Sequence, residues 1–266
     1  TICRLFVLPL RYVLLICLLT GLTLTGQSQP DLHNVKVTRL LDRPIIGPEL
    51  DPSIGVNIQG PSLIRVPDWA PGKLGEYYLY FADHKGSYIR LAYADALTGP
   101  WRIHVPGSLQ IEDSYFPAET PPFDPAELAQ MVAEREAAGV VLMHDLATEL
   151  TSTHIASPDV HVDEENRRFI MYFHGLADVG RQVSRVATSP DGINFTTQPQ
   201  ELGRTYMRAF KHEGMTYVMA MPGQFYRSVD GFTDFESGPL LFNPAMRHSA
   251  LLKRGNTLYV FWTQAG

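Results

Sequence analysis

The 266-residue sequence predicts an all-β protein, a β-propeller built from four-stranded units. A run of alternating apolar and aromatic residues, typical of buried strands, recurs four times, at 78–81, 170–173, 217–220 and 259–262. A shorter strand with a polar start precedes each run, at 60–64, 157–161, 206–210 and 247–251. Self-similarity of this kind at roughly 40–50 residues is typical of propeller blades.

A third strand and a turn complete each unit. The third strands are expected at 88–94, 182–188 and 224–228. Asp-Gly turns at 191–192 and 230–231 then favour a hairpin into a fourth strand. The chain therefore contains three such units and begins a fourth. A β-sandwich, which also has short strands and frequent turns, is the alternative.

One segment, 105–153, interrupts the repeat, and we predict an inter-blade insertion there. Within it, Asp124 as cap, Pro125 in the first turn and Gly139 beyond the end predict a helix. Loops of this length usually cover or shape a binding face, although packing on the rim is an equal alternative.

The first 28 residues resemble a secretory signal peptide. Arg4 and Arg11 precede an apolar run at 12–24, and small residues follow it, which fits cleavage after Ser28. The apolar run is shorter than a membrane span needs, although a retained N-terminal anchor stays open. We expect an exported, periplasmic or extracellular protein with no stable membrane insertion after leader cleavage. Residues 29–266 would form the propeller domain, truncated at its C-terminus.

Composition narrows the function classes. Both cysteines, Cys3 and Cys17, lie in the predicted leader, so the remaining domain can form no disulfide. The net charge is −6, and the 22 Lys and Arg residues are scattered without basic blocks, which argues against a nucleic-acid partner.

Four stretches of the first unit carry a resemblance to a known family: Gly60 to Val66, Tyr77 to Asp83, Ile89 to Asp95 and Gly99-Pro100-Trp101. They resemble a blade of the glycoside hydrolase family 43 and 32 superfamily. The resemblance runs from about Asn57 to Gln264. It implies a five-bladed propeller, of which about three and a half blades are present, with a sugar bound at the mouth of the central channel.

The resemblance also implies three carboxylates on the inner strands, but this sequence departs from that pattern. Gly60 stands where the first Asp is expected and Ser157 where the second is expected. Tyr206 and Arg208 stand where the Glu general acid is expected. Asp51 copies the first motif more literally, in Asp-Pro-Ser-Ile, but lies too far before the next strand, which favours a turn residue.

A polar cluster follows the second strand of the first unit. Asp83 is a candidate base and His84 a candidate proton carrier. Lys85 and Arg90 are candidate donors to sugar hydroxyls or a carboxylate. An exposed hairpin tip is the alternative interpretation.

The second unit supplies the strongest carboxylate candidate, Asp159. His154, Ser157, Asp159 and His161 alternate along a predicted strand, and Asp159 with His154 could form an acid–base pair. His174 closes the following strand in the same place as His84 in the first unit. The alternative is a core histidine bonded to a backbone carbonyl and an Asp that caps a turn.

The third and fourth units add four further candidates. Arg208, Tyr226 and Arg247 are candidate sugar contacts, and His248 is a candidate general acid in place of the missing Glu. No helical H-x-x-x-H or Cys-His spacing predicts a metal site, so no cofactor is expected, although a structural cation in the channel stays open.

We therefore predict an exported glycoside hydrolase-like protein that acts on an oligo- or polysaccharide at the channel mouth. The alternative is a non-catalytic carbohydrate-binding propeller. A scaffold propeller is a weaker third reading, because polar clusters on inner strands are costly without a ligand.

Overall fold

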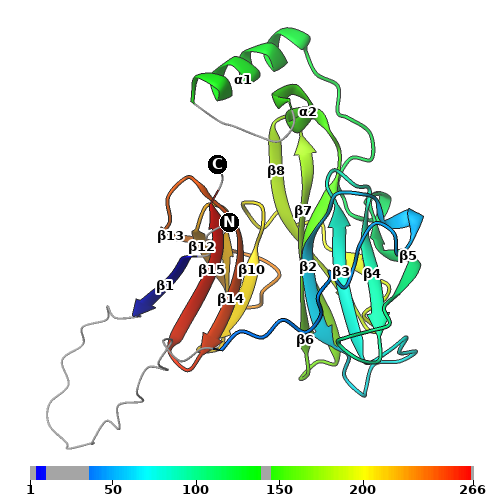
Figure 1. The fold of residues 1–266 in the computed structure, drawn as a ribbon. Helices are drawn as coiled ribbons and strands as arrows, with labels where there is room; N and C mark the ends of the chain where they lie inside the picture. The colour runs from blue at the N-terminus through cyan, green and yellow to red at the C-terminus, as the bar shows by residue number, and fades with distance from the viewer. Residues whose placement is uncertain (1–3, 10–35, 139–144, 265–266) are drawn as a thin grey trace, which may run out of the picture.

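The computed structural model describes residues 4–9, 36–138 and 145–264, and its fold is an all-β propeller, as the sequence predicts. Within these residues the strands form three four-stranded antiparallel sheets and one three-stranded sheet. Figure 1 shows blades one and two on the right, blades three and four on the left, and the helices above them.

Each complete blade is a meander of four consecutive strands. Blade one contains β2 (Ile58–Arg65), β3 (Tyr77–Asp83), β4 (Tyr88–Ala94) and β5 (Arg102–Gln110). Blade two contains β6 (Ile155–Asp163), β7 (Arg168–Asp178), β8 (Arg181–Ser189) and β9 (Thr196–Thr197). Blade three contains β10 (Arg208–His212), β11 (Met215–Ala220), β12 (Gln224–Ser228) and β13 (Glu236–Leu240).

The fourth sheet is formed by β14 (Met246–Arg254) and β15 (Thr257–Gln264), with β1 (Arg4–Pro9) paired antiparallel to β15. β1 falls within the predicted leader, and residues 10–35 of that region lie outside the described residues. The leader and its cleavage after Ser28 stay a prediction.

Apolar faces pack between successive blades and form the core. One cluster joins blades one and two and includes Tyr80, Leu91 and Phe169. A second joins blades two and three, and a third joins blades three and four around Met219 and Trp262. The second strands are buried on both faces, which explains their nearly continuous apolar sequence.

Two tyrosines hydrogen-bond to the turns of the following blade. Tyr80 on β3 donates its hydroxyl to the carbonyl of Gly192 at 2.6 Å, and Tyr172 on β7 donates to that of Gly231 at 2.9 Å. Both turns are built alike, with the Asp191 or Asp230 carboxylate accepting from backbone N–H groups. Blade three has Met219 at the aligned place in β11, where a hydroxyl is absent.

The inner strands β2, β6, β10 and β14 line the channel. β2 packs against β6, and β10 against β14. A hydrogen bond joins β6 to β10, in which the Ala209 N–H on β10 donates to the Asp159 carboxylate on β6 at 2.7 Å. Short 3₁₀ turns (Pro52–Ile54 and Ile111–Asp113) flank blade one.

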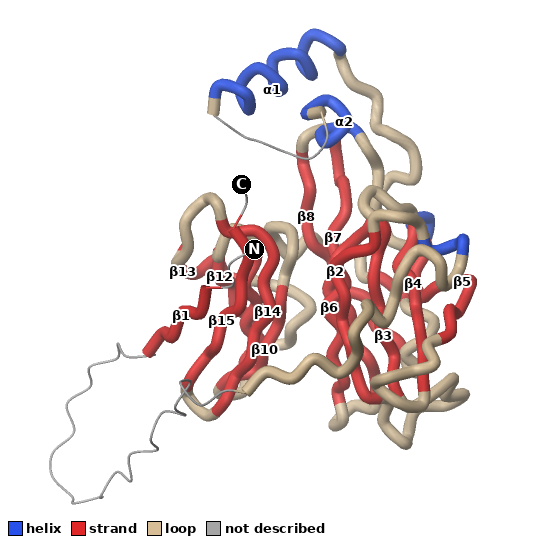
Figure 2. Tube along the Cα trace, viewed as in Figure 1, coloured by secondary structure: helices blue, strands red, loops and turns tan. Residues whose placement is uncertain are grey.

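The inter-blade segment carries α1 (Pro125–Ala137) and α2 (Leu146–Thr151). The predicted helix at Asp124 is confirmed: the Asp124 carboxylate accepts from the Ala126 N–H at 2.8 Å, and Pro125 lies in the first turn. Residues 105–110, which we assigned to the insertion, belong to β5. The sequence obscures this strand because Pro106 and Gly107 (φ 72°) interrupt it where its register shifts. Figure 2 shows the two helices above the sheets, at one end of the channel.

Candidate functional site

A cavity of about 720 Å³ lies at the end of the channel that faces the insertion. All four blades contribute to it, together with α1 and α2. Its polar or aromatic lining residues include His84, Lys85, Arg135, Glu149, His154, His174, Gln182, Arg204, Tyr206 and Arg247. We call this space the insertion-end cavity.

Four aromatic rings form a continuous row along this end of the channel. The centroids of His154 and His174 are 5.7 Å apart, and those of His174 and Tyr206 are 4.4 Å apart. Tyr206 then meets His248 at 4.9 Å. The row therefore runs from blade two through blade three to blade four.

The three histidines of the row are held in the neutral form. Burial, and then the charge of Lys85, lowers the pKa of His154 to about 4. Burial lowers the pKa of His174 well below its usual value, and burial with the charge of Arg247 lowers that of His248. Neutral imidazoles have one donor and one acceptor nitrogen, so at neutral pH these rings suit hydrogen bonds with hydroxyl groups.

The histidines differ in their partners. The Nδ1 atom of His154 lies 2.9 Å from the Ser152 carbonyl, which fixes the proton on that nitrogen and leaves Nε2 as the acceptor. The Nδ1 atom of His174 is buried and has no hydrogen-bond partner among the described residues. A buried nitrogen without a hydrogen-bond partner raises the free energy of the folded protein. Such groups are common where a ligand supplies the missing partner.

A carboxylate enters the cavity from the insertion. Glu149 on α2 forms an ion pair with Lys85, whose Nζ atom lies 2.7 Å from Oε2 of Glu149. The Nε2 atom of His84 lies 3.9 Å from Oε1 of the same carboxylate. The side chains of Lys85 and Glu149 are both 13% exposed. α2 is held there by Leu146 and Leu150, which are buried, and by the Asp145 cap.

The inner strands place Gly60, Ser157 and Tyr206 at equivalent points, each with positive φ (64°, 53° and 61°). A register shift marks this point in β2 and β6. These are the residues at which the resemblance implies carboxylates, and none of them is acidic. A Cβ on Gly60 would lie 2.8 Å from the Ser157 Cα, so an Asp at position 60 would not fit without backbone movement.

Asp159 lies in a second cavity of about 530 Å³, bordered by the inner strands of all four blades. It pairs with His161 (2.7 Å) rather than with His154, and it also accepts from the Ala209 N–H. Burial would raise the pKa of Asp159, but His161, Arg208 and this N–H outweigh burial and lower it. Its carboxylate is therefore ionised and already bonded within the protein.

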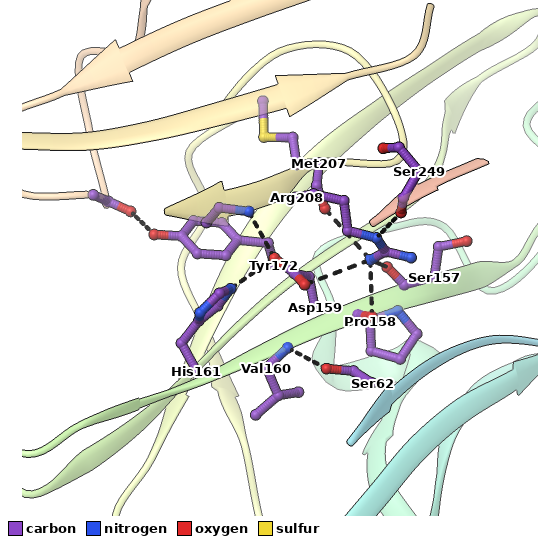
Figure 3. A network of polar contacts seen from close by, with 12 residues as sticks. Ser62, Ser157, Pro158, Asp159, Val160, His161, Tyr172, Met207, Arg208 and Ser249 are labelled. Atoms are coloured by element: carbon purple, nitrogen blue, oxygen red, sulfur yellow. Dashed lines mark hydrogen bonds and ion pairs between the residues drawn. The ribbon is translucent and has the colours of Figure 1, made fainter. Parts of the chain in front are cut away.

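Arg208 ties three inner strands together, as Figure 3 shows. Its guanidinium donates to the carbonyls of Ser157, Pro158 and Ser249, and lies 3.9 Å from the Asp159 carboxylate. An arginine so fully bonded is a structural cross-link between blades, which leaves it few donors for a sugar.

The remaining candidates lie outside both cavities. Asp83 accepts from the Asn57 N–H at 2.8 Å, and the Arg90 guanidinium packs over the Tyr88 ring. The Tyr226 hydroxyl accepts from the Arg204 N–H at 3.4 Å. Asp51 accepts from the Ser53 N–H as the cap of a short turn. Each side chain has a local bonding role.

The structure thus brings five predicted site residues to the insertion-end cavity: His84, Lys85, His154, His174 and Arg247. Asp159, Arg208 and His248 border the second cavity. Sequence reasoning missed Glu149, because α2 is short. An Asp145 cap with Leu146 and Leu150 four apart was the available signal.

Among the described residues, no group of three His, Cys, Asp or Glu side chains is arranged to hold a metal ion. No helix within the same residues is long and apolar enough to cross a membrane.

Comparison with known proteins identifies one sequence relative and several structural ones. No model of a protein family matches the chain. The uncharacterized protein R118 of Acanthamoeba polyphaga mimivirus is 32% identical over 236 residues, which cover 79% of this chain and 59% of that protein. The chain thus spans less than two thirds of the relative's length.

Two solved exo-β-1,3-galactanases share the fold. The enzyme from Phanerochaete chrysosporium, solved with β-1,3-galactotriose, is 12% identical with a TM-score of 0.52 over 78% of this chain and 44% of that one. The enzyme from Clostridium thermocellum is 15% identical with a TM-score of 0.51 over 78% and 42%. The chain therefore has a divergent form of the β-propeller fold found in these glycoside hydrolases.

Proposed function

We propose that the protein binds a saccharide in the insertion-end cavity. The observation that carries this proposal is the row of His154, His174, Tyr206 and His248, of which the first three rings line a cavity of about 720 Å³. Small-molecule sites usually measure roughly 300–1,000 Å³ and combine aromatic walls with a few polar groups.

The chemistry of the row suits a sugar. Neutral imidazoles and a tyrosine hydroxyl offer both donors and acceptors to hydroxyl groups, and ring faces pack on apolar C–H surfaces. The fold supports the same conclusion, since a galactanase with this fold was solved with a galactotriose.

Hydrolysis is the second candidate, and Glu149 favours it. Glycoside cleavage normally requires an acid and a second carboxylate on either side of the scissile bond. Glu149 is the only carboxylate among the described residues that line the insertion-end cavity. Asp159 borders the other cavity and Asp83 borders neither. Binding without turnover is therefore better supported than catalysis, because Glu149 has no second carboxylate beside it among the described residues that line this cavity.

A binding and product-release panel tests both candidates. Galacto-, xylo- and arabino-oligosaccharides would be titrated calorimetrically into wild type and Tyr206→Ala, with Tyr217→Ala as control. Tyr217 lies in the same blade, stacks on Phe210 and lines neither cavity. We expect Tyr206→Ala to weaken binding about 10-fold or more and the control to leave it unchanged.

Product release from the same sugars separates the candidates. Binding without release supports a lectin-like propeller. Release that is abolished in Glu149→Gln, with fold and binding intact, supports a hydrolase. If no saccharide binds at millimolar concentration, the proposed function is wrong.

We also propose that the protein acts outside the cytoplasm, on the basis of the leader-like residues 1–28. Cleavage after Ser28 would remove β1 and open the edge of β15. Mass spectrometry of the protein recovered from a secreting host tests this, and a mature N-terminus at Gln29 is expected. Exported protein that still carries residues 1–28 would show a retained anchor instead.

A further inference from the structure

We propose that the insertion-end cavity selects saccharides that carry an anionic group, with the carboxylate of a uronate as the preferred form. This inference rests on the proposed saccharide binding and adds the substrate class. It arises from the balance of charges around the cavity.

The lining of the cavity is basic although the chain as a whole is acidic. Lys85, Arg135, Arg204 and Arg247 line it, against one carboxylate, Glu149. The whole chain has a net charge of −6. Because a concave site with low-dielectric walls focuses the field of its charges, this excess of cations attracts anionic ligands.

Two of the four cations are engaged within the protein. Lys85 is paired with Glu149 at 2.7 Å, and Arg135 donates to the Gly180 carbonyl at 3.1 Å. Arg204 and Arg247 form no ion pair with any other residue that the structure describes. These two guanidiniums, from blades three and four, are the cations left to meet a ligand.

The field of Arg247 reaches the ring row. Its charge contributes to the lowered pKa of His248, after burial, and it opposes the burial that raises the pKa of Tyr206. The charge of Arg247 thus acts on the rings of Tyr206 and His248, and a sugar bound against these rings would place a substituent near Arg247.

His174 supplies the second, independent observation. Its ring lines the cavity and is 2% exposed, and its Nδ1 has no hydrogen-bond partner among the described residues. A ligand oxygen that reached this nitrogen would supply the partner it lacks, in the tautomer that carries the proton there. A neutral sugar offers no counter-charge to Arg204, which is exposed, or to Arg247, which is half-buried, whereas a carboxylate accepts bidentate bonds from arginine.

The test compares a charged saccharide with its neutral twin. Trigalacturonate and its fully methyl-esterified form have the same ring skeleton and differ in charge. Calorimetric titration into the full chain in 50 mM NaCl is expected to show at least about 10-fold tighter binding of the acid. The difference should shrink in 500 mM NaCl, because added salt screens the guanidiniums.

Charge-neutralising variants locate the effect. Arg204→Gln and Arg247→Gln are each expected to weaken binding of the acid about 5–10-fold and to leave the ester unchanged. Arg254→Gln is the matched control, since Arg254 is exposed in the β14–β15 hairpin and lines neither cavity. A 6-sulfated galactotriose, titrated in parallel, distinguishes a sulfate ester from a uronate as the source of the anion.

The outcomes separate this inference from the function on which it rests. Tighter binding of the sulfated sugar than of the uronate would support an anionic ligand and reassign its source. Equal affinities for acid and ester would overturn the inference while leaving saccharide binding intact. Failure of every saccharide, charged or neutral, would overturn the proposed function itself.

Discussion

The Nζ atom of Lys85 lies 2.7 Å from Oε2 of Glu149, which joins the end of a blade-one strand to a helix more than sixty residues later in the chain. This ion pair is one polar link between the insertion and the channel wall, beside the bond from the Gly180 N–H to the Leu150 carbonyl at 2.8 Å. It holds α2 over the cavity and sets the charge of the lining.

Replacing Glu149 by Gln keeps the shape of this link and removes its negative charge. We expect stability to fall by about 1–3 kcal/mol, because Lys85 loses its partner at a site only 13% exposed. Affinity for an anionic saccharide should rise several-fold. Urea denaturation and calorimetric titration measure the two effects. Glu236→Gln, which breaks an exposed pair with Arg227, should change neither appreciably. Weaker anion binding in Glu149→Gln would contradict the electrostatic argument.

The Asp159–His161 pair predicts a pH dependence of stability. Asp159 has a lowered pKa, so its contribution is present above the ordinary value of 3.8 and is lost as pH falls through the lowered value. Burial lowers the pKa of His161, but Asp159 outweighs burial and raises it. The stability contributed by His161 is complete below pH 6.5 and is lost as pH rises through its raised pKa. The pair should therefore stabilise the fold most between about pH 4 and 6.5.

His161→Gln should remove the alkaline part of this dependence. Wild type is expected to lose stability relative to His161→Gln between pH 5 and 9, measured by urea denaturation. The effect will be modest, because the His161 side chain is 39% exposed and solvent screens the pair. His104→Gln, at a histidine without an ion pair among the described residues, serves as the control. Parallel curves for wild type and His161→Gln would show that the pair does not titrate as described.

His154 predicts a loss of stability in acid. Its pKa is about 4, against an ordinary value of 6.5. Between pH 4 and 6.5, therefore, the unfolded chain binds a proton at this histidine that the folded chain does not bind. Stability should fall by up to about 3 kcal/mol as pH drops from 6.5 to 4, at 1.36 kcal/mol per unit. His154→Gln should flatten this region of the curve. Histidine NMR provides a direct check, and an imidazole at position 154 that titrates near pH 6.5 would refute the burial argument.

The tyrosine-to-turn bonds predict a stability cost for loss of a single hydroxyl. Tyr80→Phe and Tyr172→Phe each leave a turn carbonyl, at Gly192 or Gly231, without its buried donor. We expect each to lower the free energy of unfolding by about 1–2 kcal/mol in urea titrations. Tyr259→Phe is the matched control, since Tyr259 is a buried residue whose hydroxyl makes no hydrogen bond with the described residues. Equal midpoints for all three variants would show that the bonds contribute nothing.

The sequence predicted the blades well because their signal is local and repeated. Alternation within the second strands and the Asp-Gly turns at 191–192 and 230–231 located the strands of each complete blade. β5 was partly assigned to the insertion, because Pro106 and Gly107 look like a break when the partner strand β4 is not known.

The site was only partly predictable, because partners across the channel depend on the packing of blades. His84, Lys85, His154, His174 and Arg247 could be selected by type and place in the repeat. Asp159 pairs with His161, two residues away on the same face of β6, and the register shift between Ala156 and Asp159 separates it from His154. Glu149 was missed because nothing local to α2 reveals that Lys85 lies opposite.

The bonds from Tyr80 and Tyr172 also give the propeller a direction. Blade one holds the turn of blade two, and blade two holds that of blade three, but Met219 ends the series before the fourth sheet. Beyond that point Arg208, donating to Ser249, supplies the polar connection. We therefore expect the first three blades to unfold together and the amide protons of the last sheet to exchange first.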